Sequence, residues 1–281
     1  MTASLEDEWR PRSPVFAGLE PTLNIAHRGG AGLYPENTLA AFVAAVSEHG
    51  CPMLETDVQL TADNEVVVFH DAALHRTTDG DGPIADWTLK ALRGLDASAR
   101  FVAADDVADP FRGHGLGIPT LREALRALPE TRFNIEVKSP DPKLVDATVE
   151  VLREEGAVGR VVVGSEHDAL AERLVHAYPE GSHFFPRDRL FAWVMAVVGG
   201  QPPPAPGPYS VIAMPAIYQG VPLVTPTLIA EARRAAVWLN VWTIDEEKDM
   251  RWLMDLGVGG IMTDRPDRLA ALLRERRRSV Q

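Results

Sequence analysis

Residues 53–71 read MLETDVQLTADNEVVVFHD and contain two short apolar runs, at 53–59 and 66–70. Only TADNE or so separates the runs, whereas a crossover between parallel strands needs about a dozen residues. The two runs are therefore predicted to pair as an antiparallel hairpin that turns at residues 62–64. Asn64 suits such a turn because asparagine tolerates the left-handed backbone conformation.

Seven further apolar or β-branched runs have the length of strands, and helical patterns lie between most of them. These runs are 23–27, 133–138, 160–164, 182–186, 210–214, 238–243 and 259–263. With one arm of the hairpin set aside, eight runs remain, and strand–helix alternation indicates parallel strands covered by helices. The predicted fold is therefore α/β, a (β/α)8 barrel. An open, doubly wound sheet is the alternative.

Six segments between the runs have the pattern of helices, and several begin after Thr, Ser or Asp and end at Gly or Pro. They are 38–50, 120–129, 141–156, 168–179, 227–237 and 246–257. Residues 71–119 break this rhythm and are rich in Asp, Gly and Ala. We predict a single barrel domain over residues 1–281, with its core at about 23–270 and residues 71–119 as a small insertion over one face.

The composition is that of an ordinary globular protein, with 46% apolar and 24% charged residues in a chain of 281. The net charge of −12 argues against nonspecific nucleic-acid binding. The single cysteine, Cys51, cannot form an internal disulfide, which fits a reducing compartment. The N-terminus has no apolar signal segment, and no apolar run reaches the roughly eighteen residues of a membrane span. We expect a cytoplasmic protein, with peripheral membrane contact as an alternative.

Reactive side chains stand at or near the ends of several predicted strands, and in a barrel the active site collects at the carboxyl ends of the strands. Glu55 and Asp57 are two residues apart, so both project to one face of their strand, and the same holds for Glu136 and Lys138. The full set is His27, Arg28, Glu55, Asp57, His70, Asp71, Glu136, Lys138 and Trp242.

Three carboxylates at one site repel one another and are costly to bury unless a cation compensates them. Oxygen ligands alone indicate a hard ion, Mg²⁺ or Ca²⁺. Arg28 and Lys138 would let the same site hold an anion, and two histidines supply an acid and a base near neutral pH. This inventory suits phosphoryl transfer.

With these residues in view, the sequence resembles the glycerophosphodiester phosphodiesterase family from about residue 23 to 270. The resemblance is carried by HRGGAGLYPENTLAAF, ETDVQLTADNEVVVFHDAALHRTT, IPTLREAL, NIEVK, VWTID and GVGGIMTDRP. The order and spacing of these segments make it specific. It implies a barrel with an insertion after the second histidine, and cleavage of a P–O bond through a cyclic phosphate that water then opens.

The resemblance also implies a role for each site residue, without saying which histidine is the acid. The roles are a divalent metal held by Glu55, Asp57 and Glu136, an acid–base pair of His27 and His70, and substrate or phosphate contacts from Arg28, Lys138 and Trp242. The chain departs from the common family pattern at Pro52, Asn64 and Asp245, none of which removes a predicted ligand. Asp245 is expected to affect how a head group is held.

Two supporting residues, Glu36 and Asp71, have both a structural and a functional interpretation. Glu36 is expected to orient a site residue, with Arg28 as the candidate. Asp71 either fixes the tautomer of His70 or helps to hold the insertion.

The chain between the first strand and the first helix also carries two expectations. Asn37 or Thr38 caps the helix that begins with TLAAF, with Asn37 favoured. Gly29, Gly30 and Gly32 let the backbone bend close to a phosphate.

The second half of the chain bears on the substrate. Phe191, Trp193, Val194 and Met195 form either an ordinary core helix or a hydrophobic lip for an acyl chain. This region is similar to lysophospholipase D-type members of the family, so the expected substrate is a small phosphodiester or a lysolipid. Two alternatives stay open: a phospholipase-type barrel that releases a cyclic phosphate, and a non-catalytic barrel that binds phosphodiesters.

Overall fold

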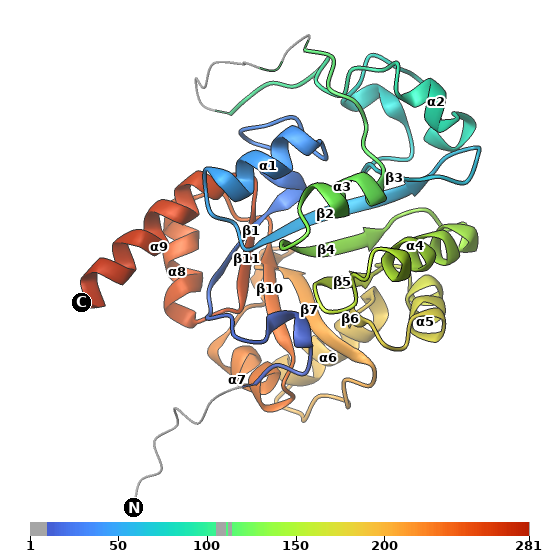
Figure 1. The fold of residues 1–281 in the computed structure, drawn as a ribbon. Helices are drawn as coiled ribbons and strands as arrows, with labels where there is room; N and C mark the ends of the chain where they lie inside the picture. The colour runs from blue at the N-terminus through green and yellow to red at the C-terminus, as the bar shows by residue number, and fades with distance from the viewer. Residues whose placement is uncertain (1–9, 105–110, 112–113, 281) are drawn as a thin grey trace, which may run out of the picture.

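Eight parallel strands close into a barrel in the computed structural model, which describes residues 10–104, 111 and 114–280 (Figure 1). The strands are β1 (Leu23–Ala26), β2 (Met53–Leu60), β4 (Arg132–Val137), β5 (Val161–Gly164), β6 (Ser182–Phe184), β7 (Tyr209–Pro215), β10 (Trp238–Trp242) and β11 (Gly260–Thr263). The barrel is closed because β1 pairs in parallel with both β2 and β11. The predicted (β/α)8 barrel is therefore confirmed, and the open sheet is wrong because it would leave two free edges.

Helices alternate with the strands and bury their apolar faces on the outside of the barrel. They are α1 (Leu39–Ser47), α3 (Leu121–Ala127), α4 (Pro142–Glu154), α5 (Asp168–Ala177), α6 (Arg187–Val198), α7 (Pro226–Arg234), α8 (Glu247–Leu256) and α9 (Pro266–Val280). Thr38, Thr120 and Thr225 cap α1, α3 and α7, because each side chain accepts a hydrogen bond from a backbone N–H in the first turn. Each of the six predicted helices overlaps an observed one.

The hairpin that reduces nine runs to eight barrel strands is present. The ninth strand, β3 (Val66–Val68), pairs antiparallel with the end of β2, with Val58 opposite Val68. Asn64 in the turn has a φ of 62°, the left-handed conformation expected for this position. The strand β3 therefore lies outside the closed ring and leads the chain into the insertion.

The insertion packs as a small unit beside the barrel, around α2 (Leu89–Leu92) in the upper part of Figure 1. It also contains the short 3-10 helices η3 (Leu74–Arg76) and η4 (Ile84–Asp86). Its apolar side chains form a separate cluster that includes residues of β3 and its neighbours, namely Val67, Phe69, Leu74, Ile84, Leu92, Ala97 and Ile118. Part of the predicted insertion, residues 105–110 and 112–113, lies outside the described residues.

A short segment before the first strand closes the barrel floor. The 3-10 helix η1 (Pro14–Phe16, dark blue in Figure 1) is followed by β1, and both Val15 and Phe16 are fully buried. The Phe16 ring stacks on the Trp238 ring with centroids 4.3 Å apart and planes 6° apart. The ordered core therefore begins before residue 23, at η1, which we call the plug.

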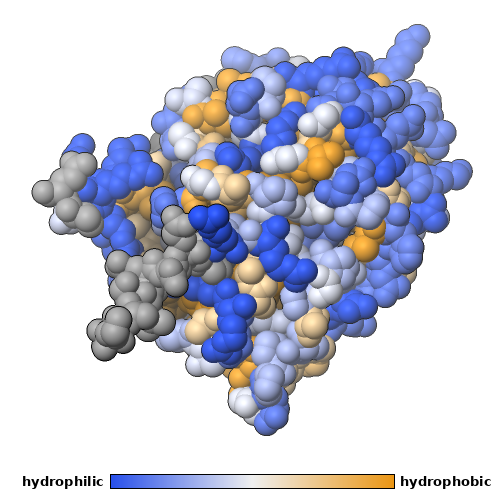
Figure 2. All heavy atoms as spheres, turned by 60° about the horizontal axis from the view of Figure 1, so that its bottom comes forward, coloured by the Kyte–Doolittle hydropathy of each residue, from blue (hydrophilic) through white to orange (hydrophobic). Residues whose placement is uncertain are grey.

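A second hairpin follows β7 at the carboxyl end of the barrel. Its strands, β8 (Ile217–Tyr218) and β9 (Val221–Pro222), turn through Gln219 and Gly220, which both have positive φ. On the face in Figure 2, hydrophilic residues dominate and hydrophobic ones lie in small separate groups. Within the described residues, no helix has both the length and the apolar character required for a membrane span.

Replacing Phe16 by Ala should lower the free energy of unfolding by about 3–5 kcal/mol, because it leaves a cavity under the barrel and removes the stack on Trp238. Urea unfolding followed by tryptophan fluorescence measures this. Phe191→Ala is the matched control, since Phe191 is 62% exposed and its loss should change stability by less than about 0.5 kcal/mol. Equal effects of the two substitutions would contradict the role of the plug.

Candidate active site

Alternation along β2 and β4 brings four charged side chains to the inside of the barrel mouth. Met53 belongs to the interior cluster, and Glu55 and Asp57 follow it at two-residue steps, so they face the same way. Asp57 is paired in register with Glu136, and Lys138 follows two residues later. The exposed fractions of Glu55 and Asp57 are only 6% and 1%. The structure thus brings together the three predicted metal ligands and the predicted phosphate-binding lysine.

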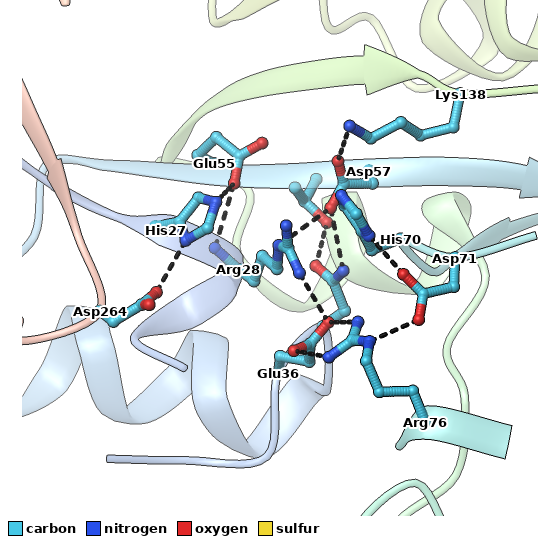
Figure 3. Close-up of polar contacts among 12 residues, drawn as sticks. His27, Arg28, Glu36, Glu55, Asp57, His70, Asp71, Arg76, Lys138 and Asp264 are labelled. Carbon is cyan, nitrogen blue, oxygen red and sulfur yellow. Dashed lines mark hydrogen bonds and ion pairs between the residues drawn. The ribbon is translucent and has the colours of Figure 1, made fainter. Parts of the chain in front are cut away.

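Two cations are interleaved with these carboxylates, and Figure 3 shows both of them beside Asp57. Lys138 Nζ lies 2.8 Å from Glu136 Oε2 and 3.3 Å from Asp57 Oδ1. Arg28 Nε lies 3.5 Å from Asp57 Oδ2, and the Arg28 backbone N–H donates to Glu55 Oε2 at 3.1 Å. Asp57 therefore sits between the two cations, whereas Glu55 accepts a backbone N–H and faces His27 Nε2 at 3.8 Å.

The acidic cluster keeps an excess of negative charge. Burial raises the pKa of Glu55 to about 7, and the neighbouring Asp57 adds to the rise. Burial likewise raises the pKa of Glu136, although Lys138 opposes this. Carboxyl groups with raised pKa values are not fully compensated by their protein neighbours. The site is therefore one that a further cation would stabilise.

His27 lies beside the cluster at the end of β1 and is held by a carboxylate. Its Nδ1 is 2.7 Å from Asp264 Oδ1, while its Nε2 faces Glu55 Oε2 at 3.8 Å. Burial lowers the pKa of His27, but Glu55 and Asp264 outweigh this effect and leave the pKa above its ordinary value. With Nδ1 committed to Asp264, Nε2 is the atom that can exchange a proton with a bound molecule.

His70 has the same arrangement on the other side of the cluster. Its Nδ1 is 2.6 Å from Asp71 Oδ1, which leaves Nε2 for the site. The Gln59 side chain donates to the His70 carbonyl at 3.0 Å and so ties the strand end to β2. Of the two interpretations of Asp71, the contact with His70 is observed. Both histidines therefore present the same ring nitrogen, each oriented by its own carboxylate.

Asp264 is held in turn by Asp245, which follows β10. Asp245 Oδ1 accepts hydrogen bonds from the Asp264 backbone N–H at 2.8 Å and from Thr263 Oγ1 at 3.0 Å. Burial, and then the charge of Asp264, raises the pKa of Asp245. Asp245 thus lies behind Asp264, where it supports the partner of His27, and its effect on how a head group is held stays a prediction.

The glycines after His27 are required for packing. Gly29 has a φ of 86°, and a Cβ there would lie 2.8 Å from Ala41 Cβ in α1. Gly30 has a φ of 94°, and its Cβ would lie 2.9 Å from Pro266 Cγ at the start of α9. These two glycines let this turn fit between two helices, and the expectation that the turn serves approach to a phosphate stays a prediction. Arg28, between His27 and Gly29, itself has a φ of 50°.

Glu36 holds the Arg28 side chain as expected, and it has a second partner from the insertion. Glu36 Oε1 accepts from Arg28 Nη1 at 3.1 Å, and the Arg76 guanidinium contacts both Glu36 oxygens at 2.6 and 2.8 Å. Burial alone would raise the pKa of Glu36, but Arg76 and Arg28 reverse this and leave it below its ordinary value. Glu36 is therefore a charged link between the first turn and the insertion.

The favoured assignment of Asn37 as a helix cap is wrong. Thr38 is the cap residue of α1, whereas Asn37 has a φ of 57° and turns toward the site. Its Nδ2 donates to Asp57 Oδ2 at 3.3 Å, and its Oδ1 accepts from Thr56 Oγ1 at 2.7 Å. The left-handed backbone, which asparagine tolerates, aims this side chain at the acidic cluster.

The opposite arc of the mouth is apolar. By the same alternation, the interior positions at the ends of β5, β6, β7 and β10 are occupied by Gly164, Phe184, Ala213, Pro215 and Trp242. A Cβ on Gly164 would lie 2.7 Å from the Phe184 ring, so this ring packs directly over the glycine. The predicted substrate contact Trp242 is 41% exposed on this arc.

The predicted hydrophobic lip divides between core and surface. Trp193 and Val194 of α6 are buried in the core, as in the core-helix interpretation, whereas Phe191 and Met195 are exposed on the outside of that helix. The exposed apolar residues that follow a barrel strand at the mouth are instead those of the β8–β9 hairpin, Ile217, Tyr218 and Val221.

The carboxylates of the cluster do not form a closed metal site as they lie. Within the described part of the chain, no three histidine, cysteine or acidic side chains converge in a ready metal-binding arrangement. Lys138 lies within 3.3 Å of both Asp57 and Glu136 and occupies the space between them. The donor set nevertheless fits a hard cation, because it is all carboxylate and retains uncompensated charge at Glu55.

Four site residues were not singled out from the sequence, or were given another role. Asp264 stands in the quoted GVGGIMTDRP segment, and Arg76 stands in the quoted HDAALHRTT segment. The sequence pattern gives Asn37 and Asp245 other roles. Asp245 and Asp264 stand just after strands, whereas Asn37 precedes a helix and Arg76 lies in the insertion, and each has a partner that is not adjacent in sequence.

The comparisons with known proteins agree with this geometry. Residues 27–268 match the model of the Glycerophosphoryl diester phosphodiesterase family. A glycerophosphodiester phosphodiesterase of Caldanaerobacter subterraneus subsp. tengcongensis is 32% identical over 90% of this chain and 98% of the relative. A lysophospholipase D of Rattus norvegicus is 29% identical over 89% of this chain and 85% of the relative.

A solved structure has both the same fold and a bound product. It is an Oleispira antarctica phosphodiesterase in complex with sn-glycerol-3-phosphate, 25% identical with a TM-score of 0.71, covering 90% of this chain and 97% of that one. The chain therefore belongs to the glycerophosphoryl diester phosphodiesterase family and is a phosphoric diester hydrolase.

Proposed function

We propose that this protein hydrolyses a glycerophosphodiester or a lysophospholipid with the help of a divalent metal and of His27 and His70. The observation that carries the proposal is the pair of histidines, each with Nδ1 on a carboxylate, flanking a buried acidic cluster. Such a pair provides a proton acceptor and a proton donor at one phosphorus, which is what transfer between two oxygen atoms requires.

The metal would be Mg²⁺ or Ca²⁺, held by Glu55, Asp57 and Glu136. The pKa values of Glu55 and Glu136 support this, because burial raises both and the neighbouring charge of Asp57 raises them further. When bound, the ion would supply positive charge that stabilises the phosphoryl oxygens. For the ion to bind, Lys138 would have to release the carboxylates that it now contacts.

The remaining steps are assigned to side chains of this protein. Arg28 and Lys138 bind the phosphate oxygens. Among the described residues, the buried Arg28 Nε makes no hydrogen bond and only faces Asp57 Oδ2 at 3.5 Å, so it is an available donor. One histidine removes a proton through Nε2 from a neighbouring substrate hydroxyl as that oxygen attacks phosphorus. The other histidine protonates the departing alkoxide, which leaves a cyclic phosphate and an alcohol. Water then opens the cyclic phosphate with the proton roles reversed.

The apolar arc of the mouth supports a substrate whose organic group is apolar. Trp242, Ile217, Tyr218 and Val221 are all 41–56% exposed and follow β7 and β10 at the end of the barrel that carries the site. Exposed apolar side chains at a site mouth are typical of contact with lipid. The relative from Rattus norvegicus is a lysophospholipase D. The same surface is our proposal for peripheral contact with a membrane.

Replacing His70 by Ala should lower kcat on glycerophosphocholine by about 10²- to 10⁴-fold, because one of the two proton carriers is lost. Steady-state kinetics with a chelator and with added Mg²⁺ or Ca²⁺ would measure this and test the metal. His176→Ala is the matched control, since His176 lies on the outer helix α5, where its Nδ1 lies 3.0 Å from the Glu172 carbonyl oxygen. Full activity after exhaustive metal removal would sink the metal proposal.

Glu55→Gln should stabilise the metal-free protein above pH 7. Folding raises the pKa of Glu55 from 4.5 to about 7, so in this window the folded protein holds a proton that the unfolded chain has lost. Stability therefore falls as pH rises through the window and is lowest above it. At about pH 8 the substitution should add about 1–3 kcal/mol to the free energy of unfolding. Metal affinity and activity should both be lost.

Urea unfolding in a chelator, with calorimetric Mg²⁺ titration, measures both effects. Thr61→Val, at a buried polar position outside the acidic cluster, is the control for the loss of a polar group. Unchanged metal affinity in Glu55→Gln would remove Glu55 from the ligand set.

Replacing Ile217 by Ser should raise KM for a lysophosphatidylcholine by about 5- to 10-fold and leave glycerophosphocholine unaffected, because an exposed apolar contact is worth about 1 kcal/mol. Phe191→Ser on the outside of α6 is the matched control.

Phosphorus NMR of the same reactions identifies the product: a persistent cyclic phosphate would favour the phospholipase-type alternative. Tight diester binding without turnover would favour the non-catalytic one.

A further inference from the structure

Arg76 joins two parts of the site that are distant in sequence. It is the last residue of η3, at the start of the insertion, and its side chain is 42% exposed. Its Nη1 and Nη2 donate to the two oxygens of Glu36 at 2.8 and 2.6 Å, and its Nε donates to Asp71 Oδ2. The guanidinium thus binds two carboxylates at once: Glu36 through both Nη atoms and Asp71 through Nε.

Each of these carboxylates also holds a residue of the proposed chemistry. Asp71 uses its other oxygen for His70 Nδ1, at 2.6 Å, and Glu36 Oε1 also accepts from Arg28 Nη1 at 3.1 Å. Figure 3 shows the continuous path from His70 through Asp71, Arg76 and Glu36 to Arg28. Arg76 lies in the middle of this path and contacts neither end.

The geometry of this junction requires the guanidinium group. Arginine is planar and presents its donors in a fixed fork, so it can bind one carboxylate through both Nη atoms and another through Nε. A lysine ammonium is a point charge and cannot keep two carboxylates in one plane. The substitution Arg76→Lys would therefore keep the charge and lose the alignment.

Stabilisation of the fold does not account for the position of Arg76. Half-exposed ion pairs contribute between zero and about 1 kcal/mol. The insertion has another such pair, in which Arg93 Nη2 lies 2.6 Å from Glu123 Oε1 of α3, with side chains 53% and 38% exposed. That pair fastens the insertion to the barrel without touching the site, and it provides an internal comparison.

We propose that Arg76 is a positioning residue that fixes His70 and Arg28 relative to each other, so that the proton carrier and the phosphate ligand meet the same substrate. This inference rests on the proposed function of that site. It makes the first turn of the insertion a working part of the site. The insertion must therefore be docked for the histidine and the arginine to be aligned.

Kinetics of Arg76→Ala and Arg76→Lys test the proposal, with Arg93→Ala as the matched control. Both Arg76 variants should lose about 10- to 100-fold in kcat/KM, as is typical when an outer partner of a site residue is removed. Thermal unfolding should remain within a few degrees of the wild type, and Arg93→Ala should keep full activity. Added guanidinium should partly rescue Arg76→Ala and leave Arg76→Lys unchanged.

A double-substitution cycle locates the effect. In an Asp71→Asn and Glu36→Gln background, Arg76→Ala should have little further effect, because the groups through which it acts are already altered. Full additivity, or kcat/KM of Arg76→Ala within twofold of the wild type, would overturn the proposal.

A spectroscopic readout separates this inference from the proposed reaction. Nitrogen-15 NMR of the His70 ring, recorded above the ordinary titration range of histidine, reports which nitrogen carries the proton. The wild type should hold the proton on Nδ1, and Arg76→Ala should shift population to Nε2 as Asp71 is released. This shift would support the positioning role even if no diester were hydrolysed. An unchanged tautomer would overturn the role even in an active enzyme.

Discussion

Three acidic side chains, two of them buried and the third half-buried, lie side by side on two adjacent barrel strands, and the site around them is organised by the repulsion that results. Glu55 and Asp57 on β2 and Glu136 on β4 face the interior because strand residues alternate. If these carboxylates were fully charged and unpaired, the free-energy cost of removing them from water would oppose folding. Lys138 and Arg28 offset part of the charge, and the raised pKa of Glu55 marks the part that remains.

The surrounding contacts form layers, each holding the one inside it. Asp264 and Asp71 orient the two histidines. Asp245 in turn holds the backbone N–H of Asp264, and Arg76 holds the carboxylate of Asp71. The surroundings of the two histidines differ in charge. Asp71 is paired with a cation, whereas Asp264 lies beside a second carboxylate. The two histidines therefore have matching geometry and different electrostatic surroundings.

Local pattern was enough to predict the framework. The strands and helices follow from apolar periodicity and capping residues, and the five-residue TADNE link leaves room only for the hairpin that Val58 and Val68 form. The charged strand-end residues were also predictable, since register follows from the barrel. The roles of Asn37, Gly29 and Gly30 were not, because each depends on an element far along the chain. Asn37 needs Asp57 as a partner, and Gly30 is required by Pro266.

The buried apolar residues of the second half illustrate the same limit. Trp193 and Val194 have the composition of a lipid-contacting surface, yet the turn of α6 directs them into the core and leaves Phe191 outside. The rotation of the helix about its axis decides which side chains face the core, and composition alone does not determine that rotation. The β8–β9 hairpin was missed because its strands are only two residues long each.

The insertion leaves and rejoins the barrel at neighbouring points. The backbone N–H of Val68 donates to the Pro119 carbonyl at 2.8 Å, and Val67 forms a bridge with Thr120. Because the two ends already meet, the length of chain between them changes the entropy of closure only slowly. His70 directly precedes it, and Asp71 and Arg76 lie in its first few residues. Evolution could therefore exchange most of this segment, and with it the selectivity at the mouth, while the proton-transfer machinery stays intact.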